Sequence, residues 1–92
     1  MVEATFTIDH PAGLHLRPAA LFVQTAARFT SRVRLTNVSR ADAPEVDAKS
    51  IFGIMQSGVS QGDQVRVWAE GPDAAAAIAA LQGLVARNLD DS

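Results

Sequence analysis

The chain has 92 residues, of which 48% are apolar and 20% charged, with a formal net charge of −2 and no cysteine. This length suits one domain with one core, and the composition is that of a globular protein rather than a disordered one. The charge gives no support to nucleic-acid binding, and the lack of cysteine excludes a disulfide framework, a thiolate metal site and a cysteine nucleophile.

The N-terminal residues and the apolar runs bear on location. The first residues lack the basic and apolar regions of a signal peptide. No apolar run is long enough to cross a bilayer. We therefore expect a cytoplasmic protein without membrane insertion. The polar residues 90–92 are expected to fray.

The first half of the chain reads as strand, turn, helix and strand. Apolar and polar residues alternate over residues 2–9, which is the period of a half-buried strand. Proline and glycine mark a turn at 10–13, and a helix then fades near residues 28–31. A second strand at 32–36 leads into a polar connection from Asn37 to Pro44. The predicted buried face of the helix consists of Leu16, Ala20, Val23 and Ala27, widened by Phe22, Ala26 and Phe29.

The second half of the chain is predicted to contain a strand, a helix, a strand and a helix. A short strand is expected around residues 45–48, and Ser50 is placed to cap a helix over 51–57. Alternation predicts a last strand over 65–69, and Asp73 then begins the final helix, where its charge suits the helix dipole. The apolar stripe of that helix is Ile78, Leu81, Val85 and Leu89.

The resulting order is βαββαβα. Because the strands alternate, one face of the sheet is wet and the other is covered, which favours an antiparallel sheet with helices on one side. We therefore predict an α+β fold, with residues 1–92 forming a single domain.

The most informative segment is Gly13-Leu14-His15-Leu16-Arg17-Pro18-Ala19-Ala20. It joins a glycine turn to a helix start, where N–H groups and a partial positive charge form an anion site. Arg17 adds a guanidinium group suited to phosphate oxygens. His15 supplies an imidazole nucleophile, and the positive helix end disfavours its protonated form.

A simpler interpretation of His15 is a solvated residue that precedes a helix. No acidic residue adjoins it in sequence to orient the ring, and nothing nominates a Ser/His/Asp triad. With only His10 and His15 available, a metal site built on imidazole is not expected. No nucleotide motif is present, so no cofactor is expected.

Two segments carry a resemblance to a known family. The segment around His15 closely resembles the active-site signature of the histidine-containing phosphocarrier (HPr) family of the bacterial phosphoenolpyruvate:sugar phosphotransferase system. The segment Ala48-Lys49-Ser50-Ile51-Phe52-Gly53-Ile54-Met55 is similar to the family's regulatory-serine region. The spacing of the segments and the order βαββαβα also agree with the family, so the resemblance covers essentially the whole chain.

The resemblance implies a phosphoryl carrier rather than an enzyme with its own turnover. His15 would accept a phosphoryl group from enzyme I and donate it to enzyme IIA proteins or domains in sugar transport, while Arg17 would neutralise the group during transfer. An open-faced sandwich is also implied, with a sheet in the order 1-4-2-3 covered on one face by three helices. We expect a monomer.

Ser50 is open to two roles. As an N-cap it would stabilise the short helix by about 1 kcal/mol. The resemblance adds regulatory phosphorylation by an HPr kinase/phosphorylase, which would place a dianion at the helix start and disturb partner binding. The two roles are compatible.

The short helix carries more apolar residues than one buried side can hold. Either all of them fill the core, or some are exposed beside His15 as a docking surface. In the resembling family this helix contacts partners. The partner-binding residues that this implies are Ile51, Phe52, Met55, Leu16 and Ala20.

Three features depart from the family pattern. Leu16 stands where a small residue or threonine is usual, and Ala12 lacks a polar side chain that many members have near the phosphorylated ring. The connection from Asn37 to Pro44 is longer than usual, at a place where insertion costs little.

Three further side chains receive structural interpretations. His10 is expected to be a turn residue, and Lys49 a solvated charge near the docking surface. Trp68 is expected on the open face of the sheet, partly exposed and packed with Arg66.

Two alternatives to a sugar-transport carrier remain. One is a paralogue in a nitrogen-regulatory or dihydroxyacetone-kinase phosphorelay, which the residues near His15 do not distinguish. The other is a regulatory binding module that carries no phosphoryl group; relatives of that type lack the active-site histidine, so His15 argues against it.

Overall fold

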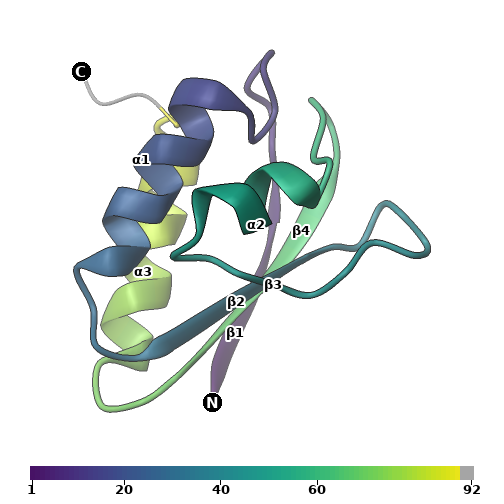
Figure 1. Cartoon of the computed structure of the whole chain (residues 1–92). Helices are drawn as coiled ribbons and strands as arrows, with labels where there is room; N and C mark the ends of the chain where they lie inside the picture. Colours follow the sequence, from purple (N-terminus) through teal and green to yellow (C-terminus); the bar gives the residue numbers. More distant parts are fainter. Residues whose placement is uncertain (90–92) are drawn as a thin grey trace.

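A four-stranded antiparallel sheet forms one layer of the molecule (Figure 1). The computed structural model describes residues 1–89. The strands are β1 (Val2–Thr7), β2 (Arg32–Asn37), β3 (Val46–Asp47) and β4 (Gln64–Glu70). They lie in the order β1-β4-β2-β3, so that β4 pairs antiparallel with both β1 and β2. The antiparallel sheet and its order confirm the prediction.

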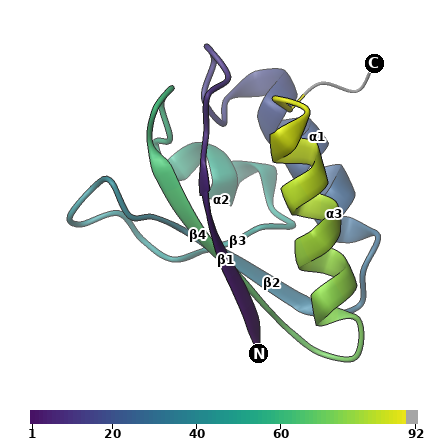
Figure 2. The same ribbon diagram turned by 180° about the vertical axis from the view of Figure 1, so that it is seen from behind.

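Three helices cover one face of this sheet, as the views from the two sides show (Figures 1 and 2). They are α1 (Leu16–Ala27), α2 (Ile51–Gln56) and α3 (Ala74–Ala86). Along β4, Val65 and Val67 are buried against the helices, whereas Arg66 points to the open face. The open-faced sandwich is therefore confirmed, while the fraying predicted for residues 90–92 lies outside the described residues.

The open face carries Trp68, as predicted. The side chain is half-buried, and the guanidinium carbon of Arg66 lies 5.0 Å from the centre of its ring. Arg66 also pairs with Glu3 on β1, at 3.3 Å between Nε and a carboxylate oxygen. The Arg66 side chain thus packs over the Trp68 ring on the face of the sheet that no helix covers.

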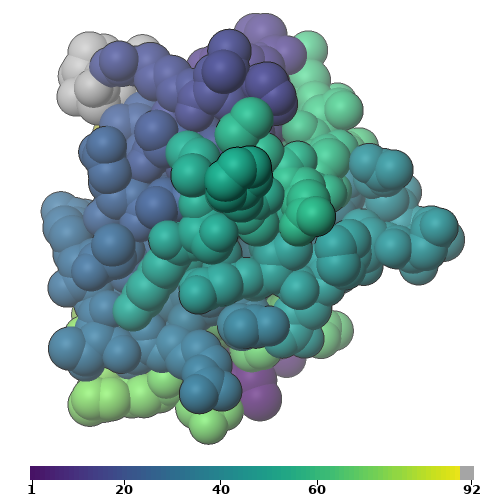
Figure 3. Space-filling view, viewed as in Figure 1, coloured from purple at the N-terminus to yellow at the C-terminus, as the bar shows by residue number. Residues whose placement is uncertain are grey.

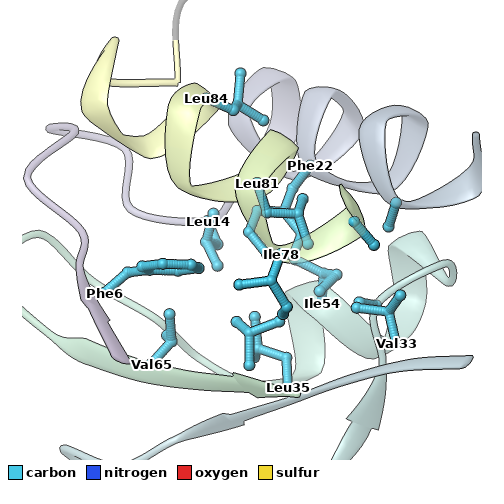
Figure 4. Close-up of a cluster of buried hydrophobic side chains, with 14 of the residues drawn as sticks. Phe6, Leu14, Phe22, Val33, Leu35, Ile54, Val65, Ile78, Leu81 and Leu84 are labelled. Atoms are coloured by element: carbon cyan, nitrogen blue, oxygen red, sulfur yellow. The ribbon is translucent and has the colours of Figure 1, made fainter. Parts of the chain in front are cut away.

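The core lies between the sheet and the helices (Figure 4). Inward-facing strand residues such as Val65 meet Ile54 of α2 and Leu81 of α3 there. Leu14, which precedes α1, is 1% exposed and belongs to the same cluster. The core therefore anchors the turn that leads into the first helix.

The predicted buried face of α1 is right for Phe22 and Ala26 and wrong for Leu16 and Ala27. The buried residues are Pro18, Ala19, Phe22 and Ala26, while the Leu16 side chain is 68% exposed and Ala27 is exposed. Apolar residues surround most of this helix, so their spacing alone does not select one stripe. The face that buries the large ring of Phe22 decides the orientation.

Several boundaries also differ from prediction. Asn37, assigned to the polar connection, is the buried last residue of β2, where its side-chain amide donates to the backbone oxygen of Ser57 at 3.2 Å. Leu89 is buried as predicted but lies beyond the end of α3, with a φ of 57°. At Asn37 a tertiary contact overrides the local pattern, whereas at Leu89 the chain leaves the helix with its N–H still bonded to the backbone oxygen of Leu84.

Asp73, which precedes α3, connects its own turn to the turn between α1 and β2. Its carboxylate accepts hydrogen bonds from the backbone N–H groups of Thr30 at 2.9 Å and Ser31 at 2.8 Å, and from both hydroxyl groups. The Ser31 side chain, then the Thr30 backbone, lower the pKa of Asp73 from 3.8 to about 2, although partial desolvation opposes them. The residue predicted to serve its own helix therefore stabilises the turn between α1 and β2.

We expect Asp73→Asn to lower the thermal unfolding temperature at pH 7, because a neutral amide replaces the carboxylate acceptor. Because the folded pKa is below the ordinary value, the wild type keeps this stabilisation above about pH 4 and loses it as the pH falls toward 2. Unfolding measured from pH 7 to pH 2 should show the two proteins converging. A constant difference across that range would contradict the assignment, and Asp42→Asn, in the exposed connection after β2, is the matched control at neutral pH.

Candidate functional site

A tight turn precedes the segment around His15. The N–H of Gly13 donates to the backbone oxygen of His10 at 2.8 Å, and the N–H of Ala12 donates to Nδ1 of the same histidine at 3.0 Å. His10 is thus a turn residue, as predicted.

Gly13 allows this turn to lie directly against the loop that follows α2. Its φ is +61°, and a Cβ atom there would stand 2.2 Å from the backbone oxygen of Val59. The next N–H, from Leu14, donates to that same oxygen at 3.2 Å. Since Leu14 points into the core, this contact fixes which way the following residue faces.

His15 is exposed at the N-cap position of α1, with extended φ and ψ of −126° and 153°. Its ring makes no capping hydrogen bond, and the first turn of the helix contains no acidic residue. The ring therefore stands at the positive end of a twelve-residue helix. Pro18 occupies the first turn, where a missing N–H is tolerated, as predicted.

Leu16 begins α1 with a φ of +49°, a left-handed conformation that L-residues with a side chain rarely adopt. Such strain persists only where the surrounding structure imposes it, and it concentrates at functional sites. Here it lies between the exposed imidazole and Arg17, which is exposed in the first turn of the same helix. One of the three non-glycine residues with positive φ in the described chain therefore lies within the candidate site.

Ser50 caps α2, as predicted. Its hydroxyl oxygen accepts a hydrogen bond from the N–H of Gly53 at 3.1 Å, and its own N–H donates to the backbone oxygen of Asp47. The half-buried side chain is thus held at the start of the helix.

The apolar residues of α2 divide between the core and the surface. Ile54 is buried, Phe52 is 81% exposed and Ile51 is 40% exposed. We name the exposed or half-buried set Leu16, Ile51, Phe52 and Met55 the apolar patch. The interpretation in which all the apolar residues of α2 fill the core is therefore wrong.

The apolar patch and His15 lie on neighbouring elements. Helix α1 packs against α2, and in Figure 3 the green-teal atoms of α2 reach the surface just below the purple and blue atoms of the turn and the start of α1. Ala20 is half-buried on α1. An imidazole, a guanidinium group and a patch of apolar side chains thus belong to adjoining parts of the surface.

A depression of about 310 Å³ adjoins the ring of His15. One wall comes from the preceding turn, and the other from Met55 and the loop over residues 58–61. Sequence reasoning missed this second wall. Nothing in the sequence pattern indicates that this loop contacts Gly13, which is distant from it along the chain.

The role predicted for Lys49 is also corrected by the structure. It was expected to be a solvated charge, but its Nζ donates to the backbone oxygen of Phe29 at 2.6 Å. That oxygen lies just beyond the C-terminal end of α1, where a cation is favourable. The bond therefore ties the segment before α2 to the end of α1.

Within residues 1–89, no group of three or more His, Cys, Asp or Glu side chains could hold a metal ion. None of the helices in this described range has the length and apolar character needed to span a bilayer.

The comparisons with known proteins agree with this arrangement. A model of the PTS-HPr family, the PTS HPr component phosphorylation site, matches residues 2–87. The phosphocarrier protein HPr of Treponema pallidum is 38% identical over 91 residues, which cover 99% of each protein. A multiphosphoryl transfer protein of Haemophilus influenzae is 41% identical over 91 residues, covering 99% of this chain, but the chain spans 18% of that protein's length.

A solved structure supports the same assignment. The crystal structure of HPr-C-His from Thermoanaerobacter tengcongensis matches with a TM-score of 0.89 at 47% identity, covering 100% of this chain and 99% of that one. The sequence match, the fold and the shared length are therefore consistent with one another. The chain belongs to the HPr family of the phosphotransferase system, whose members are phosphocarrier proteins rather than catalysts.

Proposed function

We propose that His15 accepts the phosphoryl group and donates it again. The observation that carries this proposal is the exposed imidazole at the N-cap of α1, with no capping bond of its own. A lone pair of a ring nitrogen forms the new P–N bond, while the bond from phosphorus to the donor breaks and the donor leaves with that electron pair. Reversal of this step onto an acceptor restores the free ring.

Arg17 and the first turn of α1 stabilise the transferred group. The phosphoryl oxygens carry negative charge throughout the transfer, and N–H groups and a guanidinium group at a helix start are suited to them. Because the helix fixes its backbone N–H groups before the reaction, these donors need little reorganisation when phosphorus changes partner. The exposure of both His15 and Arg17 suits a group handed between proteins.

The partners are protein surfaces that dock over the apolar patch. We propose enzyme I as the donor and enzyme IIA proteins or domains as the acceptors, in the cytoplasm. Phe52, Leu16 and Ile51 supply the exposed contact area, and the half-buried Ala20 and Met55 complete it. We further propose that residues 1–92 act as a single, monomeric domain, with sugar transport favoured over a nitrogen-regulatory or dihydroxyacetone-kinase branch.

Phosphoenolpyruvate and enzyme I should place one acid-labile, base-stable phosphoryl group on the chain, and His15→Ala should abolish it, because the acceptor nitrogen is lost. Mass spectrometry would locate the group. His10→Asn is the matched control, since it removes the other histidine but keeps a hydrogen-bond acceptor in the turn. Full labelling of His15→Ala would overturn the proposal.

Phe52→Glu should weaken enzyme I binding by about tenfold or more, because a charge would replace the most exposed aromatic contact. Isothermal titration calorimetry would measure the affinity, and circular dichroism should show an unchanged fold. Val38→Glu places the same charge on another exposed apolar residue, 47% exposed and outside the apolar patch. Equal losses for both variants would count against docking over α2.

Ser50 is proposed as a regulatory phosphorylation site for an HPr kinase/phosphorylase. With kinase and ATP, mass spectrometry should map phosphate to Ser50, and the product should accept phosphoryl groups from enzyme I more slowly, because the dianion borders the apolar patch. Ser50→Ala should block labelling and lower the free energy of unfolding by about 1 kcal/mol, since the cap of Gly53 is lost. Phosphate on another serine, or none, would refute the assignment.

A further inference from the structure

The depression beside His15 contains one side-chain donor with no bond of its own. Apart from the imidazole, the side chains lining it that carry donors are those of Ser60 and Gln61. The Gln61 amide donates to the backbone oxygen of Asp9 at 2.9 Å and is thereby engaged. Within the described residues the Ser60 hydroxyl bonds to nothing, although the rest of this residue is firmly held.

The backbone of Ser60 is fixed from two sides. Its N–H donates to a carboxylate oxygen of Asp63 at 3.0 Å, and its carbonyl oxygen accepts from the N–H of Asp63 at 3.0 Å. The same carboxylate oxygen accepts from the buried amide of Asn37 at 3.1 Å, which connects the loop to the end of β2. The backbone of Ser60 is thus held in place by hydrogen bonds, although the residue lies in a loop.

The backbone of Ser60 also lies against the turn that carries His15. A Cβ atom on Gly13 would come within 2.9 Å of the Ser60 Cα atom, so the two segments are in contact. On the turn side of the depression, Pro11 and Ala12 offer no side-chain donor. The Ser60 hydroxyl is therefore a side-chain donor that a group extending from His15 into the depression can use.

We propose that the Ser60 hydroxyl donates a hydrogen bond to the phosphoryl group carried on His15 and thereby stabilises the phosphorylated protein. This inference rests on the proposed function of His15. A hydrogen bond to an anionic oxygen is stronger than one between neutral groups, and a donor fixed in advance loses little entropy in forming it. Ser60 is thus a positioning residue for the carried group, separate from the apolar patch that docks partners.

An equilibrium competition tests this role. Equimolar wild type and Ser60→Ala are mixed with catalytic enzyme I and limiting phosphoenolpyruvate, so that phosphoryl groups exchange between the two carriers until equilibrium. Intact-mass spectrometry then measures the phosphorylated fraction of each. We expect the wild type to hold the group about tenfold more strongly, the order expected for one hydrogen bond to a charged group. Because the distribution is read at equilibrium, altered docking rates cannot produce it.

Two variants separate this role from a structural one. Ser60→Thr keeps the hydroxyl and should compete equally with the wild type, while Thr5→Val removes an exposed hydroxyl on the open sheet and should do the same. Equal partition between wild type and Ser60→Ala would overturn the inference and leave the proposed function intact. A wild type that takes no phosphoryl group on His15, either from enzyme I or from phosphoramidate, would overturn both.

Discussion

The candidate site depends on the contact between Gly13 and the backbone of Val59. There is no room for a side chain at Gly13, and the hydrogen bond from Leu14 to the Val59 oxygen closes the contact. With Leu14 committed to the core, the next residue must face outward. The exposed imidazole, the left-handed start of α1 and the depression beside the ring all follow from this packing of one turn on one loop.

The site also depends on how α2 is held. Ser50 fixes its first turn, Ile54 buries its inner side, and Lys49 ties the preceding segment to the end of α1. With these three contacts in place, a helix of only six residues can present Phe52 to solvent without unfolding. Met55, which belongs to the apolar patch, also lines the depression beside His15, so the site and the docking area share this helix.

Sequence reasoning identified what local chemistry determines. Strand alternation gave the sheet and its covered face, and the capping serine located α2. The burial of α1 was predicted only in part, because its apolar residues leave several stripes equivalent and the packing of Phe22 decides between them. The role of Lys49 and the far wall of the depression were missed because both depend on contacts between segments distant in sequence. The roles of His15 and Arg17 rest on chemistry and resemblance, and remain proposals.

The central place of β4 governs how this chain can fold during synthesis. Val2 of β1 pairs with Ala69 of β4, and Arg32 of β2 pairs with Glu70 of β4. Neither β1 nor β2 can therefore complete its pairing before β4 has been synthesised. Of the strand pairings in the described sheet, only the short one between β2 and β3 can form without residues 64–70. Closure of the sheet is thus a non-local event, and the edges of β1 and β2 stay unpaired until β4 is available to them.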